Sequence, residues 1–179
     1  MKMKLVIVAS FVIGVCSFSA HATEAGKSYI DGSKSFLEIK DINRQAEAWA
    51  MCSAAYDVMA EILSEAQPAQ SKLLSEFANG AQLAVTMCMF AEGLDPEITP
   101  ERFNALWKVA QLAGTEIPKT RRTMLEAEAE ATPKEDISKF ISNLAATVEV
   151  CVKNLSGQQA YIDTWRELAK SGLLAFPDE

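Results

Sequence analysis

The chain has 179 residues, of which 49% are hydrophobic and 23% charged, a length that suits one domain with its own core. Its 24 acidic residues outnumber its 17 basic ones, so the net charge is −7. A surface of this sign repels phosphate backbones and anionic lipid, which argues against nucleic-acid binding and against docking on an anionic membrane.

Residues 1–22 have the order of a secretory signal peptide: a basic start, an apolar run, and a small-residue stretch ending in Ala-His-Ala. The apolar run covers residues 5–15, whereas a membrane-spanning helix needs about 20 residues. We therefore expect cleavage after Ala22, no stable membrane insertion of the mature protein, and a periplasmic location, with full secretion as the alternative.

Cleavage changes the chemistry that the chain can support. Lys2 and Lys4 leave with the signal, so the charge of the mature chain becomes 15 − 24 = −9. The sole histidine, His21, is also lost. A chain without imidazole cannot build a Ser-His-Asp or Cys-His nucleophile, a His-ligated zinc site or a His-ligated haem. We therefore expect a protein that is not an enzyme and holds no cofactor or metal.

The remaining chain divides into a leader and one helical domain. Residues 23–34 lack periodicity and are expected to form a loose leader, followed by a single domain over 35–179. From residue 35 the apolar residues recur every three or four positions, which indicates helices throughout and no strand. We expect helices over about 35–65, 68–92, 100–131, 133–155 and 158–171.

Caps and prolines set several of these boundaries. Pro68 and Pro100 suit first helical turns, and Thr99 is placed to cap the helix that Pro100 opens. Thr132 before a further proline predicts the next helix start in the same way, whereas Pro118 predicts a break in the third helix. The pattern favours an all-α fold: an antiparallel bundle of four long helices, the third broken near Pro118, plus a short C-terminal helix.

Three cysteines, Cys52, Cys88 and Cys151, remain after export, and an oxidising compartment favours one disulfide and one free thiol. In an up-down bundle, at 1.5 Å per residue, Cys88 and Cys151 lie at levels within about 3 Å of each other. Cys52 and Cys88 differ by about 10 Å, so their bond would need an offset hairpin. We therefore predict a Cys88–Cys151 disulfide and a free Cys52, provided that the second and fourth helices are neighbours.

Charged side chains offer two weak candidate sites. Lys119, Arg121 and Arg122 are the one basic concentration, which is either a solvated helix start or a candidate partner contact. The acidic run from Glu126 to Asp136 has the pattern of a solvated helix surface, whereas a glycosidase needs two carboxyls that flank a cleft.

These observations favour a non-catalytic periplasmic protein that binds an unknown protein partner in the cell envelope. In size, export and helicity it resembles bacterial immunity proteins, which inhibit envelope-targeting toxins, although no sequence motif carries that resemblance. One alternative is a small-ligand carrier with a cavity in the bundle. The other is a carboxylate-dependent cell-wall hydrolase.

Overall fold

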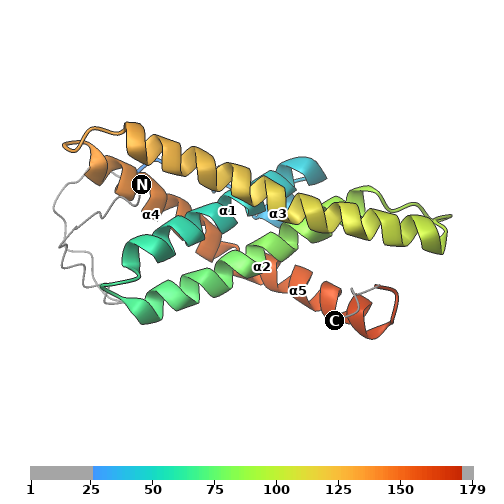
Figure 1. Cartoon of the computed structure of the whole chain (residues 1–179). Helices are drawn as coiled ribbons and strands as arrows, with labels where there is room; N and C mark the ends of the chain where they lie inside the picture. Colours follow the sequence, from blue (N-terminus) through green and yellow to red (C-terminus); the bar gives the residue numbers. More distant parts are fainter. Residues whose placement is uncertain (1–25, 175–179) are drawn as a thin grey trace.

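The computed structural model describes residues 26–174, whose regular elements are all helices, as predicted, with no strand (Figure 1). A short 3₁₀ turn precedes five α-helices. In chain order they are η1 (Phe36–Glu38), α1 (Ile42–Leu63), α2 (Pro68–Glu92), α3 (Pro100–Ala131), α4 (Ile137–Lys153) and α5 (Leu155–Lys170).

The helices form a three-helix bundle crossed by a fourth, interrupted helix. α1, α2 and α3 are antiparallel in sequence order, and each packs against the other two. α4 lies on α1, and α5 continues beyond it to lie on α2 (Figure 1). α4 and α5 have similar lengths of 17 and 16 residues, so the predicted division into four long helices and one short one is slightly off.

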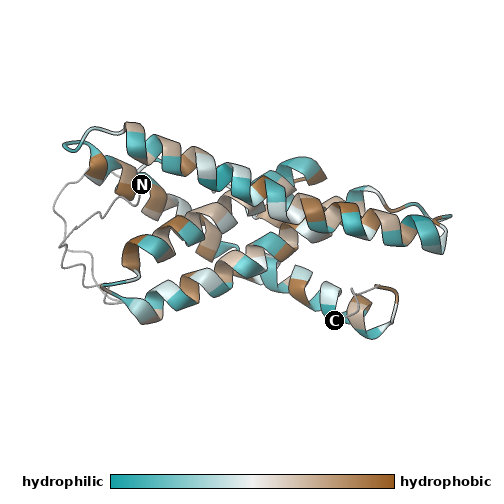
Figure 2. Cartoon of the chain, in the orientation of Figure 1, coloured by the Kyte–Doolittle hydropathy of each residue, from teal (hydrophilic) through white to brown (hydrophobic). Residues whose placement is uncertain are grey.

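α1 is the central helix because small residues cover most of its surface. Trp49 and Tyr56 are fully buried in it, and six of its alanines are buried alongside them: Ala46, Ala48, Ala50, Ala54, Ala55 and Ala60. Small side chains let α2, α3 and α4 approach α1 closely from several sides, which suits a helix that is apolar nearly all round. By contrast, α3 carries hydrophilic residues along its whole length, interleaved with hydrophobic ones (Figure 2).

The predicted cap and first-turn prolines mark the starts of α2 and α3. The Thr99 hydroxyl accepts a hydrogen bond from the Arg102 backbone N–H, so the predicted cap is confirmed. Pro68 and Pro100 open α2 and α3 as predicted. The first helix starts at residue 42 instead of 35. The Asp41 carboxylate caps it by accepting hydrogen bonds from the backbone N–H groups of Asn43 and Arg44.

The predicted break near Pro118 is wrong, because α3 runs unbroken from residue 100 to residue 131. Proline lacks an N–H and its ring crowds the carbonyl four residues earlier, which costs about 3 kcal/mol in a helix interior. Here Pro118 is buried, and the neighbouring Ile117 packs on the core that α1 and α2 form. Packing along both neighbouring helices therefore outweighs the local cost.

The predicted cap at Thr132 is also wrong. Its hydroxyl donates to the Glu128 carbonyl and so closes the end of α3 instead of opening α4. α4 begins at Ile137, after a turn in which the Asp136 N–H bonds the Pro133 carbonyl. The break between α4 and α5 falls at Asn154, which ends one helix and precedes the other.

The described part of the leader, residues 26–34, is held on α4 and on the end of α3, which corrects the expectation of a loose segment. The Lys27 N–H donates to the Asn143 side chain at 2.7 Å, and the Tyr29 N–H donates to the Thr147 hydroxyl at 3.0 Å. The Tyr29 hydroxyl donates to Glu128 at 2.5 Å. A polar segment without periodicity gave no sign of these partners, which lie about 100 residues further on.

The predicted signal peptide, residues 1–22, lies outside the described residues. Among the helices within residues 26–174, none combines the length and the apolar character that crossing a membrane would require.

Candidate functional site

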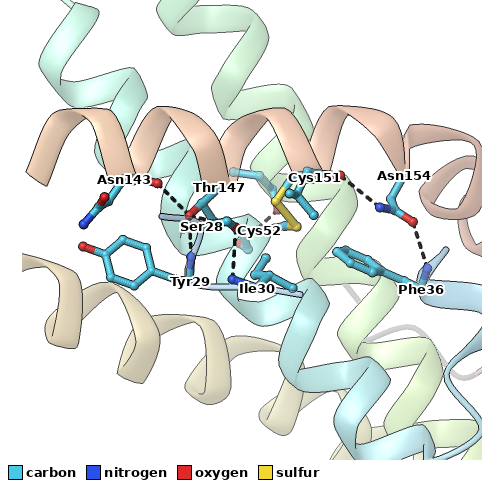
Figure 3. Close-up of a disulfide and its surroundings, with 12 residues drawn as sticks. Ser28, Tyr29, Ile30, Phe36, Cys52, Asn143, Thr147, Cys151 and Asn154 are labelled. Carbon is cyan, nitrogen blue, oxygen red and sulfur yellow. Dashed lines mark hydrogen bonds between the residues drawn. A yellow bond between two sulfur atoms is a disulfide. The ribbon is translucent and has the colours of Figure 1, made fainter. Parts of the chain in front are cut away.

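The structure corrects the predicted disulfide. Cys52 of α1 is bonded to Cys151 of α4, with their Cα atoms 5.6 Å apart, and Cys88 is free and buried (Figure 3). Cys88 was predicted to be bonded and Cys52 to be free, so both assignments are exchanged.

Two errors in the bundle arrangement produced the wrong pairing. α4 packs on α1 and not on α2, so Cys151 faces α1. α4 also begins at residue 137 instead of 133, which places Cys151 about 21 Å along its helix, against about 17 Å from Cys52 to the adjacent end of α1. With the true boundary the two levels agree to within about 4 Å.

Polar side chains of α4 hold the chain on both sides of the disulfide (Figure 3). Thr147, one turn before Cys151, accepts from the Tyr29 N–H and donates to the Asn143 carbonyl. Asn154, one turn after Cys151, accepts from the Phe36 N–H at 2.8 Å. The disulfide therefore sits within a set of contacts that fixes the N-terminal segment, α1 and α4 together.

Cys88 belongs to a buried polar chain instead of a disulfide. Its thiol donates to the Tyr161 hydroxyl at 3.3 Å, which donates to the Gln45 side-chain oxygen at 2.6 Å. The Gln45 amide in turn donates to the Phe36 carbonyl at 2.5 Å. Burial raises the pKa of the Cys88 thiol to about 11, against a smaller lowering by the Tyr161 hydrogen bond. The thiol is therefore protonated and unreactive near neutral pH.

The three basic residues predicted as a candidate partner contact are engaged within the molecule. Arg121 forms an ion pair with Glu47 of α1 at 2.5 Å, and Lys119 pairs with Glu116 on its own helix. Arg122 reaches three carboxylates, those of Asp57, Glu61 and Glu126. The arginines therefore join α3 to α1, whereas the ion pair of Lys119 is exposed and lies within α3.

The carboxylates of this region are likewise paired. Burial raises the pKa of Asp57, and the charge of Arg122 partly offsets that effect. Glu126 accepts from Arg122, and Glu128 accepts from Tyr29. No group of three or more Cys, Asp, Glu or His side chains within residues 26–174 is arranged to hold a metal ion.

A groove of about 320 Å³ opens between α2, α3 and α5. Its lining is made of amides, hydroxyls and indoles, together with one leucine. The residues are Asn79, Gln82, Leu83 and Thr86 from α2, Trp107, Gln111 and Thr115 from α3, and Trp165 from α5. None of these side chains is ionised near neutral pH.

A close approach of two helices shapes the floor of this groove. α3 passes α2 at Gly114, where an added Cβ atom would lie 1.9 Å from the Thr86 hydroxyl oxygen. Only glycine fits at that crossing. Nearby, Trp107 is 2% exposed and packs edge-on against Phe90, with ring centroids 5.3 Å apart. The indole N–H of Trp107 is buried and has no hydrogen-bond partner among the described residues.

The groove residues were not identified from the sequence, although a signal for them exists. On α2 the polar positions 79, 82 and 86 follow helical spacing, and on α3 so do positions 107, 111 and 115. Apart from the buried Thr86 and Trp107, these side chains lie at the edge of the apolar stripe of each helix, so the sequence indicates only ordinary polar surface there. Only the pairing of α2 with α3, and the arrival of α5 across them, brings the two rows together.

Comparison of the chain with protein-family models, with curated proteins and with solved structures found no significant match.

Proposed function

We propose that this protein acts by non-covalent binding and not by catalysis, with the groove between α2, α3 and α5 as its recognition site. The observation that carries the proposal is the chemistry of the lining, which supplies hydrogen-bond donors, acceptors and flat apolar surfaces without a titratable group. Such a lining orients a ligand, whereas acid–base catalysis needs a group that gains or loses a proton near the working pH.

The two threonines of the groove support this assignment. The Thr86 hydroxyl donates to the Gln82 carbonyl, and the Thr115 hydroxyl donates to the Gln111 carbonyl. A hydroxyl nucleophile requires a nearby base that removes its proton. Here each hydroxyl proton is directed to a backbone oxygen of its own helix, and the lining holds no base.

The dimensions favour a small ligand as the occupant. Small-molecule sites occupy roughly 300–1,000 Å³, and the groove lies at the lower end of that range. A stable protein complex buries about 1,200–2,000 Å² in total, which needs surface well beyond the groove. Size, export signal and helicity favoured a protein partner over a carrier, and the geometry of the groove reverses that order in our proposal. Export to the periplasm stays part of the proposal.

A protein partner remains the second candidate, because of a separate surface feature. Val109 and Leu112 lie one turn apart on α3 and are 62% and 63% exposed. Adjacent exposed aliphatic side chains suit contact with another protein. An immunity or inhibitor role would use this face of α3.

The test compares small molecules retained by two variants of the mature, oxidised protein. Thr115→Arg places a long charged side chain in the groove. Thr120→Arg is the matched control, because Thr120 is exposed on the same helix and makes the same type of hydroxyl-to-carbonyl bond. Native mass spectrometry after purification from its own envelope extract should show a bound small molecule in the wild type and in Thr120→Arg, but not in Thr115→Arg. Equal retention by all three proteins, or no bound small molecule in any, would contradict the proposal.

A further inference from the structure

The chemistry of the groove narrows the class of ligand, and this inference rests on the proposed binding function. We propose that the groove binds a neutral saccharide, with a C–H face of a sugar ring against Trp165 and the sugar hydroxyls on the amides of Asn79, Gln82 and Gln111. Each element of the lining supports one part of that assignment.

Charge is the first constraint. Within a molecule rich in ionised side chains, the groove lining has none. A ligand that carries a phosphate, carboxylate or ammonium group would give up hydration without gaining an opposite charge, which is costly. The occupant is therefore uncharged.

The aromatic side chains are the second constraint. Trp165 is half-buried, so part of its ring faces the groove, whereas Trp107 is buried at the groove floor. An exposed indole face offers a flat apolar surface with a negative electrostatic potential. The C–H groups on one face of a pyranose ring carry a small positive charge and complement that surface.

The amides are the third constraint. No hydrogen bond to another described residue engages the side chain of Asn79 or Gln111, and Gln82 makes one long contact of 3.5 Å to Thr115. Each amide presents a donor and an acceptor, and a hydroxyl group is likewise both. Sugar hydroxyls therefore match a row of unengaged amides, and an oxygen that reached the buried Trp107 N–H would satisfy that donor as well.

An extended peptide is the strongest competing occupant, and the lining argues against it. Peptide-binding grooves anchor apolar side chains in apolar pockets, or pair the peptide backbone with an exposed strand edge. This groove has one aliphatic side chain, Leu83, and the described chain has no strand. Neither mode of peptide recognition fits it well.

Saturation-transfer NMR on the mature, oxidised protein provides the test. The neutral probes are cellobiose, maltose and N,N′-diacetylchitobiose. Glucuronic acid and glucosamine are the charged comparisons, and an acetylated, amidated triglycine is the peptide comparison. We expect ring-proton signals from at least one neutral disaccharide and none from the charged sugars.

Variants separate stacking from hydrogen bonding. Trp165→Ala should weaken disaccharide binding about ten-fold, and Trp165→Phe, which keeps a flat ring, should weaken it less. Because Trp165 also packs against Trp107 and its neighbours, the exposed Gln111→Leu provides a second variant that does not disturb the core. It should weaken binding about five-fold. Thr120→Arg should leave binding unchanged.

The outcomes distinguish the two proposals. If the capped peptide or a charged sugar binds, neutral disaccharides do not, and Thr115→Arg abolishes that binding, the groove is a binding site but the saccharide class is wrong. If no probe binds and native mass spectrometry finds no groove-dependent ligand, both proposals fail. Disaccharide binding that survives both Trp165→Ala and Gln111→Leu places the saccharide elsewhere and overturns this inference.

Discussion

α4 and α5 are consecutive, nearly equal in length and separated by one residue, yet they are held in opposite ways. α4 is bonded to α1 through Cys52–Cys151 and strapped by the N-terminal segment. α5 is attached to α2 by packing and by the short polar chain through Tyr161. The groove borders α5 and not α4.

If the groove is the binding site that we propose, this small bundle separates a covalently fixed frame from its site. A covalent bond and several side-chain hydrogen bonds fix the α4 end of the molecule. The charged side chains near that end are already engaged in ion pairs or hydrogen bonds within the molecule. The α5 end borders the groove that we propose as the binding site, on a helix whose position depends on packing and a few hydrogen bonds. Local stability in proteins commonly follows this division, with binding elements at the less stable end.

The largest expected effect comes from removing the disulfide. The bond closes a sequence separation of 99 residues, which in the chain-entropy model corresponds to about 4–5 kcal/mol of stability, less any native strain. Cys151→Ser should therefore lower the melting temperature of the oxidised protein by about 10 °C or more. Cys88→Ser is the matched control and should change it far less. Non-reducing peptide mapping should recover a peptide pair containing Cys52 and Cys151, and a Cys88 crosslink in the wild type would refute the assignment.

An intermediate effect should appear in the α5 attachment at alkaline pH. Burial raises the pKa of Cys88 to about 11, so the native state keeps its proton where the unfolded state has lost it. The contribution to stability is complete below about pH 9 and is lost as the pH rises through 11, by roughly 3 kcal/mol. Thiolate absorbance, taken as wild type minus Cys88→Ser to remove tyrosine signals, should titrate near pH 11 in native protein and about two units lower in urea. A native midpoint near 9 would mean that the thiol is not buried.

The smallest effects belong to the three basic residues of α3. Each is replaced by methionine, which removes the charge and keeps most of the apolar part of the side chain. Arg122→Met should cost about 1 kcal/mol because it leaves the half-buried Asp57 unpaired, and Arg121→Met about 0.5 kcal/mol. Lys119→Met should be neutral, since its pair is exposed and lies within one helix. Urea unfolding at low and high salt measures these differences, and a loss for Lys119→Met equal to that for Arg122→Met would show that the pairing does not matter.

Local features of the sequence predicted much of the fold. α2 has the expected bounds, Thr99 caps α3, and apolar spacing predicted helices throughout the described domain. These signals depend on contacts within a few residues, which the sequence displays directly. The errors at Pro118 and Thr132 arose where contact with another helix, or a competing use of the same hydroxyl, overrode a valid local signal.

The candidate site was beyond local reasoning for a related reason. Periodicity does not show which helix lies beside α4, and that choice, together with the start of α4, decided between Cys52 and Cys88 as the partner of Cys151. The groove requires three helices to converge, and no one of them carries a motif. Rows of polar residues on separate helices can be recognised as one groove only when the packing of the helices is known.

The position of Cys88 between the two bonded cysteines has a consequence for how the protein matures. A chain that emerges from its N-terminus presents Cys52 and Cys88, only 88 − 52 = 36 residues apart, before Cys151 appears. Loop closure favours that shorter ring over the native one by about 1 kcal/mol. If the thiols oxidise as the chain emerges, we therefore expect a Cys52–Cys88 bond to form first and the Cys151 thiolate then to attack Cys52 and release Cys88 by thiol–disulfide exchange. Once α5 covers Cys88 and keeps it protonated, the exchange stops, so docking of the last helix locks the correct bond in place.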